Sequence, residues 1–159
     1  MRVSSRQTVT AGLGIVHGGG PDMAAIKRAE TALDTLKDEF AGWMEGDVKL
    51  LIAARTRYAQ KPDAGTRSGL LRAAHDIMGQ APTFQYPMIA RVAASLWRLI
   101  GKLPPGAALP LALVDAHVGA IRAMHKKGLQ DTKDRTAQDL CAALDARVDK
   151  ILAAANRPG

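Results

Sequence analysis

The sequence predicts an all-α protein, an up-down four-helix bundle with an additional N- or C-terminal helix. Apolar residues recur every three or four positions in five separate segments, which is the period of a helix with one buried face. We find no stretch of alternating apolar and polar residues that would indicate a half-buried strand. The segments are joined by short connections, as antiparallel neighbours in a bundle require.

The first helical segment follows Asp22, whose short carboxylate side chain suits an N-cap. Helix-forming residues then continue to Pro62, which stops the pattern. Gly42 and Gly46 are weak points, because glycine lowers helix stability relative to alanine. We therefore expect one long or broken helix here.

Four further helices are expected at 66–81, 87–100, 109–128 and 132–155. Pro82 ends or kinks the first of them, and Gly128 follows the cationic end of the third, where glycine is favoured. In the first three, the positions that should face the core are Leu70, Ala74, Ile77, Ala81, Ile89, Val92, Leu96, Ile100, Leu113, Val114, Val118 and Ile121. In the last helix they are Leu140, Leu144, Val148, Ile151 and Ala155.

Length and composition indicate one domain after a flexible tail. The chain has 159 residues, of which 47% are hydrophobic, enough for one cooperative core and too few to expect two. We expect a tail over 1–21 and a single helical domain over 22–156. Within that domain the bundle would cover about 36–127 and the extra helix about 131–156.

Charge and cysteine usage narrow the partners and the compartment. The net charge of +7 favours acidic partners by long-range attraction. The single cysteine, Cys141, cannot form an internal disulfide, and no apolar run reaches the length of a membrane span. We therefore expect a cytoplasmic protein with no membrane partner, in which Cys141 is a small core residue.

His75 interrupts the apolar pattern of the second helix, at the edge of its buried stripe. Periodicity alone also fits an ordinary boundary histidine that hydrogen-bonds a neighbour. Gly79, one turn later, needs a reason, because glycine inside a helix costs about 1 kcal/mol relative to alanine. Side chains lean toward the helix N-terminus, so a side chain at position 79 would cover the His75 ring. Glycine leaves the imidazole open to a large molecule.

The stretch HDIMGQAPTFQYP resembles the signature of histidine-containing phosphotransfer domains, usually H-x-x-K-G with a second glycine six residues later. The resemblance implies a four-helix bundle in which His75 carries a phosphoryl group and Gly79 clears its approach. It also implies that Arg72, Met78 and Gln80 form the surrounding docking surface. The motif covers about residues 68–90 and the architecture about 36–127.

The resemblance implies that the protein belongs to a two-component phosphorelay. Its partners would be receiver domains of response regulators, with a hybrid histidine kinase as a further candidate. The receiver would supply the metal ion, so this chain would need no cofactor or metal, and no independent substrate turnover is expected. Three positions depart from the family pattern: Met78 replaces lysine, Gln85 replaces the second glycine, and Pro82 replaces a small residue. The alternative is a degenerate docking or decoy protein that binds receivers or a kinase without phosphotransfer.

Other kinds of site have weaker signals. His117 and His125 are eight residues apart with no third ligand at a useful spacing, which argues against a metal site. The basic residues are spread over several helices without a compact recognition helix, which argues against DNA binding. Phosphate loops and nucleophile elbows are missing from the sequence. Trp43 and Trp97 fall near apolar stripes and are expected in the core.

Overall fold

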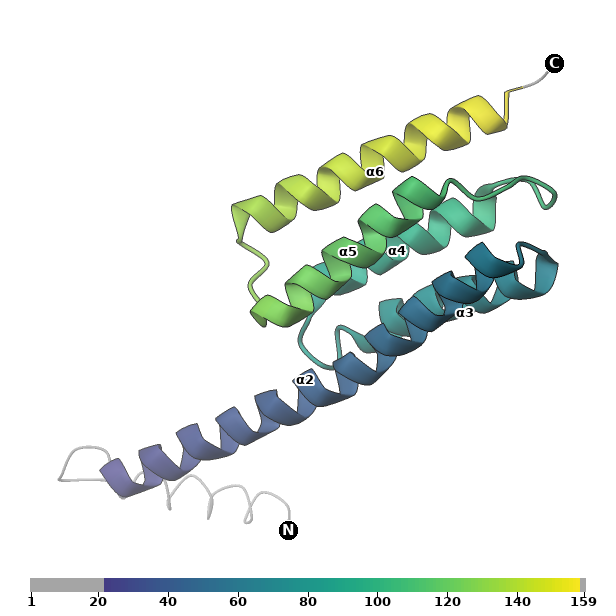
Figure 1. Cartoon of the computed structure of the whole chain (residues 1–159). Helices are drawn as coiled ribbons and strands as arrows, with labels where there is room; N and C mark the ends of the chain where they lie inside the picture. The colour runs from purple at the N-terminus through teal and green to yellow at the C-terminus, as the bar shows by residue number, and fades with distance from the viewer. Residues whose placement is uncertain (1–21, 158–159) are drawn as a thin grey trace, which may run out of the picture. The chain divides into compact units, whose positions relative to one another are not determined.

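The computed structural model describes residues 22–157 and confirms an all-α chain, with five helices and no strand among these residues. The predicted tail over 1–21 lies outside the described residues. All five expected helices are present. The helices are α2 (Met23–Gln60), α3 (Ala64–Gln80), α4 (Pro87–Lys102), α5 (Leu111–Lys127) and α6 (Arg135–Ala155) (Figure 1). Contacts divide the chain into a part that ends at Asp38 and a part that begins at Glu39, and each is described by itself.

The described residues of the part up to Asp38 are Asp22 and the first turns of α2, which begin as the sequence predicts. The Asp22 carboxylate accepts a hydrogen bond from the backbone N–H of Ala24 at 3.0 Å. Its backbone carbonyl accepts the first helical bond, from the N–H of Ile26 at 3.0 Å. The Asp22 side chain thus satisfies one of the N–H groups that a helix start leaves without partners.

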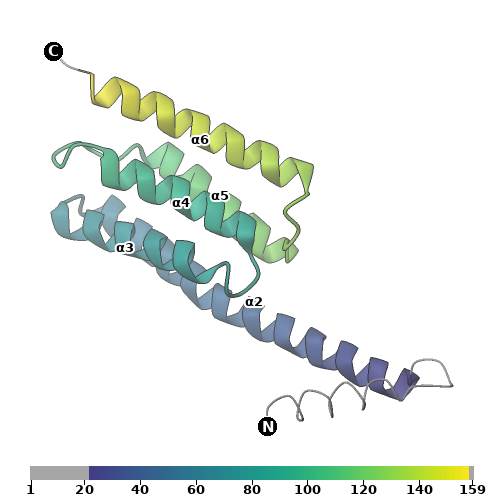
Figure 2. The ribbon, with the colours of Figure 1, turned by 180° about the vertical axis from the view of Figure 1, so that it is seen from behind.

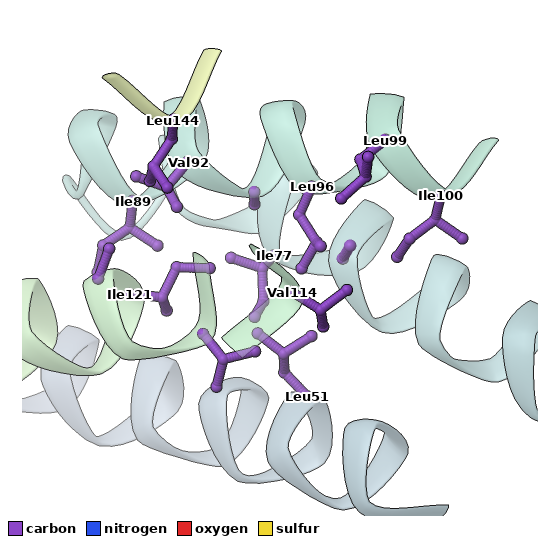
Figure 3. Packing of buried hydrophobic residues seen from close by; sticks show 14 of the residues in the cluster. Leu51, Ile77, Ile89, Val92, Leu96, Leu99, Ile100, Val114, Ile121 and Leu144 are labelled. Atoms are coloured by element: carbon purple, nitrogen blue, oxygen red, sulfur yellow. The ribbon is translucent and has the colours of Figure 1, made fainter. Parts of the chain in front are cut away.

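In the part from Glu39 onward, α4 is the most deeply buried helix. It packs against α3, α5 and α6 (Figures 1 and 2). Most of its apolar residues are buried. Leu51 of α2, Ile77 of α3 and Ile121 of α5 are fully buried beside them (Figure 3). Burying a side chain of this size contributes about 1.5–3 kcal/mol, so this shared core is the main stabilising feature.

Ion pairs add to the packing at the helix surfaces. Arg55 of α2 binds both carboxylate oxygens of Asp115 in α5, at 2.6 and 2.8 Å. Arg98 of α4 binds Asp149 of α6 at 2.6 Å. A two-pronged arginine contact has defined geometry, so the Arg55–Asp115 pair fixes helix orientation more than it adds free energy.

The predicted core positions of α3, α4 and α5 are all buried, which confirms the period of their stripes. The prediction for α6 is partly wrong: Leu144 and Val148 are buried, but Leu140 is 38% exposed and Ala155 is exposed. The residues of α6 that face the core are Ala137, Cys141, Leu144, Val148 and Leu152. These residues follow one another at spacings of three and four, and Leu140 lies just outside the stripe that they form. Cys141 is a buried core residue, as expected.

Pro82 ends α3 and does not kink it. Proline has no N–H to offer the carbonyl of Met78, so regular α3 stops at Gln80. The following turn closes with two hydrogen bonds, from the Tyr86 N–H to the Ala81 carbonyl at 2.8 Å and from the Gln85 N–H to the Pro82 carbonyl at 3.0 Å. This is the Schellman pattern, and it places Gln85 in the left-handed region with φ of 65°.

Gly128 ends α5 in the same way. It has φ of 65°, and the Leu129 N–H bonds to the Met124 carbonyl at 2.9 Å. Glycine adopts this conformation without a steric penalty, whereas a residue with a Cβ does not. The two helix ends therefore need the same backbone shape, and only one of them has the residue that adopts it freely.

We predict that Gln85→Gly stabilises the protein by about 1 kcal/mol, because it removes the left-handed penalty of a side chain. The melting temperature should rise by about 3 °C for a chain of this size. Ala142→Gly, at an exposed helical position of α6, is the control and should lower stability by a similar amount. A Gln85→Gly variant that melts at or below the wild-type temperature would contradict the assigned backbone conformation.

Candidate functional site

His75 lies on the exposed side of α3. Ala74 and Ile77 face the core, and this turns the imidazole outward, with 60% of its side chain exposed. Its Nδ1 is 3.9 Å from Oδ1 of Asp76, too long for a hydrogen bond but close enough for electrostatic attraction. The indole of Trp97 in α4 lies beside it, with 6.2 Å between ring centroids. The ring is accessible and its nearest carboxylate is on its own helix.

Gly79 leaves open space one turn after His75. A Cβ built at this position would meet nothing within 4 Å, so no packing contact in the described structure requires glycine here. The helix nevertheless bears the cost of about 1 kcal/mol that glycine brings. The surface of α3 one turn after His75 is therefore open.

The other three predicted site residues lie in different surroundings. Arg72 is exposed and lines a groove between α2 and α3, together with Arg57 and Asp76. Met78 is half-buried and packs against the core. Gln80 lines a separate hollow at the other end of α3. The structure thus places Arg72 and Asp76 in one groove and does not place Gln80 with them.

Asp47 of α2 adds a second carboxylate to this face. Burial, and after it the charge of Asp76, raises the pKa of Asp47 above its ordinary value. One of its oxygens, Oδ2, is buried without a hydrogen-bond partner. Asp47 and Asp76 therefore lie close enough for their charges to repel each other, while Arg57 and Arg72 lie in the same groove as Asp76.

Both tryptophans are exposed, so the prediction that they belong to the core is wrong. Trp43 is 53% exposed and Trp97 is 40% exposed. Each is the direct neighbour of a buried residue, Met44 or Leu96. A step of one residue turns a side chain by about 100° around a helix, so closeness to a stripe in sequence does not place a ring inside. The helical register of Met44 and Leu96 could have predicted that the neighbouring tryptophans are exposed.

The remaining described histidines have structural contacts. His117 is fully buried, and since a carbonyl only accepts, its Nδ1–H donates to the Leu113 carbonyl at 2.8 Å. Its Nε2 then accepts from the Ser95 hydroxyl at 3.0 Å. His125 donates from Nε2 to the Ala41 carbonyl at 2.8 Å. His17 lies outside the described residues, and among those described no cluster of three or more potential ligands could hold a metal ion.

Family models, curated proteins and solved structures give no match to this chain. None of the helices within 22–157 has the length and apolar character needed to cross a membrane.

We predict that His117 makes stability depend on pH. Burial lowers the pKa of His117 below its ordinary value of 6.5, and the charge of Arg98 lowers it slightly further. The hydrogen bond to Leu113 and the charge of Asp145 raise the pKa, but they do not outweigh burial. Below pH 6.5 the imidazole is therefore protonated in the unfolded chain but stays neutral in the folded chain. The free energy of unfolding consequently falls as the pH falls. Melting temperatures between pH 7.5 and 5.5 should show this decline, and His117→Gln, which hydrogen-bonds without titrating, should flatten it.

Ser95→Ala is the matched control, because it removes the hydrogen-bond partner of His117 but keeps the buried imidazole. It should lower stability while leaving the pH dependence in place. An equal slope in wild type and His117→Gln would assign the pH dependence to other groups.

Proposed function

We propose that the chain is a histidine phosphotransfer protein that carries a phosphoryl group on His75 between aspartates of receiver domains. The resemblance of residues 75–87 to the signature of that family suggests this function. The observation that supports it most directly is an exposed imidazole on α3 with open space at Gly79, one turn later. The partners would be response-regulator receivers and a hybrid histidine kinase in a cytoplasmic phosphorelay.

The proposed fold is the bundle of that family. Residues 39–60 of α2 would form an up-down four-helix bundle with α3, α4 and α5. The extra helix would then be α6, which packs on α4 and α5. The buried stripes of α3, α4 and α5 and the Arg55–Asp115 pair between α2 and α5 support this arrangement.

The proposed transfer uses the neutral imidazole as nucleophile. Asp76 near Nδ1 favours the tautomer with hydrogen on that nitrogen, so that the lone pair of Nε2 is free. Nε2 attacks the phosphorus of an aspartyl phosphate, a P–N bond forms, and the P–O bond to the aspartate breaks. The electron pair of that bond leaves with the aspartate carboxylate. Nδ1 keeps its hydrogen, and the Asp76 carboxylate stabilises the positive charge that develops on the ring.

The second candidate is a docking or decoy protein that binds the same partners without phosphotransfer. Two observations favour it. Met78 stands where the family has lysine, and its side chain packs against the core, so it offers no charge to phosphoryl oxygens. The nearest charged contact of His75 is the carboxylate of Asp76, which repels a phosphoryl group.

We predict that His75→Ala abolishes phosphoryl uptake and leaves the fold intact, because the exposed ring contributes little core area. Incubation with phosphorylated receivers, followed by acid-lability assays and mass spectrometry, should find one labelled histidine in the wild-type protein. His17→Ala, in the N-terminal segment, should label normally. Receiver binding by the wild-type protein without any label would select the docking function and reject the phosphotransfer function.

We predict that Gly79→Leu slows transfer by at least about tenfold, because a side chain there leans over the His75 ring. It should also raise helix stability, since leucine is a better helix former than glycine and the space is open. Gly69→Leu is the matched control: Gly69 is also in α3, and a Cβ there likewise meets nothing within 4 Å. Equal transfer rates in the two variants would show that Gly79 does not serve as the opening to His75.

A further inference from the structure

Three aromatic side chains form a cluster on the surface of the part from Glu39 onward. Phe40 and Trp43 come from α2, and Phe84 follows the end of α3. Their ring centroids are 5.8 Å apart for Phe40 and Trp43, 5.8 Å for Phe40 and Phe84, and 5.6 Å for Trp43 and Phe84. With Trp43 more than half exposed, this cluster presents aromatic ring surface to a binding molecule.

The cluster borders a hollow, which we call the aromatic hollow and which is lined by Gly42, Trp43, Gly46, Asp47, Gln80 and Phe84. Gly42 and Gly46 lie within unbroken α2, and a Cβ at either position would meet nothing within 4 Å. Packing within the described chain therefore does not require either glycine, although each costs helix stability. Both keep the side of α2 next to Trp43 free of side chains.

Asp47 lies on one wall of the aromatic hollow, and no group of the described chain stabilises its negative charge. Its Oδ2 is buried and has no hydrogen-bond partner. Burial penalises its charge, and the carboxylate of Asp76 repels it, which raises the pKa of Asp47. A cation bound at the Asp47 carboxylate would offset both the cost of burying its charge and the repulsion from Asp76.

We propose that the aromatic hollow binds an arginine side chain presented by a protein partner, with its guanidinium on Asp47 and its planar face against Trp43. Tryptophan has the strongest attraction for cations among the aromatic residues, and guanidinium stacks on rings while donating hydrogen bonds at its edge. The charge of the aromatic hollow suits a cation despite the basic chain, because its lining contains Asp47 and no lysine or arginine, and Glu39 lies one turn before Trp43. This site is independent of phosphoryl transfer at His75.

The probe for this site is N-acetyl-L-arginine amide. Its binding is monitored through the indole N–H signals of the two tryptophans in ¹H–¹⁵N NMR spectra. The Trp43 signal should shift and saturate at millimolar probe, while the Trp97 signal serves as an internal reference. N-acetyl-L-citrulline amide has the same shape without the charge and should bind at least about fivefold more weakly. No saturable shift of Trp43 in the wild-type protein would overturn the proposal.

Variants test the two contacts separately. Asp47→Asn should weaken arginine binding by at least about fivefold, and it should fold, because it removes a carboxylate that burial and Asp76 destabilise. Trp43→Leu should abolish binding, whereas Trp97→Leu, at the other exposed tryptophan, should leave it unchanged. Equal binding of the citrulline probe, or of arginine to Asp47→Asn, would mean an apolar pocket without cation recognition. His75→Ala should bind arginine normally, so failure here is distinct from failure of phosphotransfer.

Discussion

Burial of α4 is the constraint on which the rest of the structure depends. This helix packs against α3, α5 and α6, so each of them must turn its apolar stripe toward it. For α3 the stripe that includes Ala74 and Ile77 faces inward, and one residue of rotation then places His75 outside. The exposure of His75 and the open space at Gly79 are consequences of where α3 buries its apolar side.

A second constraint fixes the connection from α4 to α5. Arg67 of α3 donates to the carbonyls of Ile100 and Leu103, each at 2.7 Å, and to further carbonyls of the connection. These groups end α4, where a cation is favoured by the helix dipole and carbonyls lack helical partners. The N–H of Leu109 donates to the Tyr58 hydroxyl at 3.0 Å. One arginine and one tyrosine thus anchor a segment rich in proline and glycine to α3 and α2.

The sequence was sufficient for the helices and for the stripes of α3, α4 and α5, because large branched residues repeat there at one unambiguous period. It was insufficient where two stripes compete. In α6 the small residues Ala137 and Cys141 are buried and the larger Leu140 is partly exposed, so residue size alone did not predict which side faces the core. The prediction that Trp43 lies in the core was wrong for a similar reason, since the hydrophobicity of a residue does not determine on which side of a helix its ring lies.

The candidate site was predictable to the same extent. His75 and Gly79 are local features, one turn apart on one helix, and the structure leaves both exposed as the pattern indicates. The aromatic hollow and the unpartnered Asp47 oxygen combine residues of α2 with residues at and beyond the end of α3. No spacing within one helix indicates such a combination. Contacts between elements distant in sequence require the packed structure.

The departures from the phosphotransfer signature have different physical consequences. Gln85 occupies a backbone position with φ of 65°, where the family's glycine would be free of strain, so this change bears on stability and leaves the His75 surface unaltered. Pro82 ends α3 after Gln80, and the chain recovers the lost hydrogen bonds in the following turn. Only Met78 removes a charge from the neighbourhood of His75. Under the proposed function, phosphoryl transfer at His75 would need a receiver to supply the positive charge that Met78 does not offer, and the shape of the helix end would matter less.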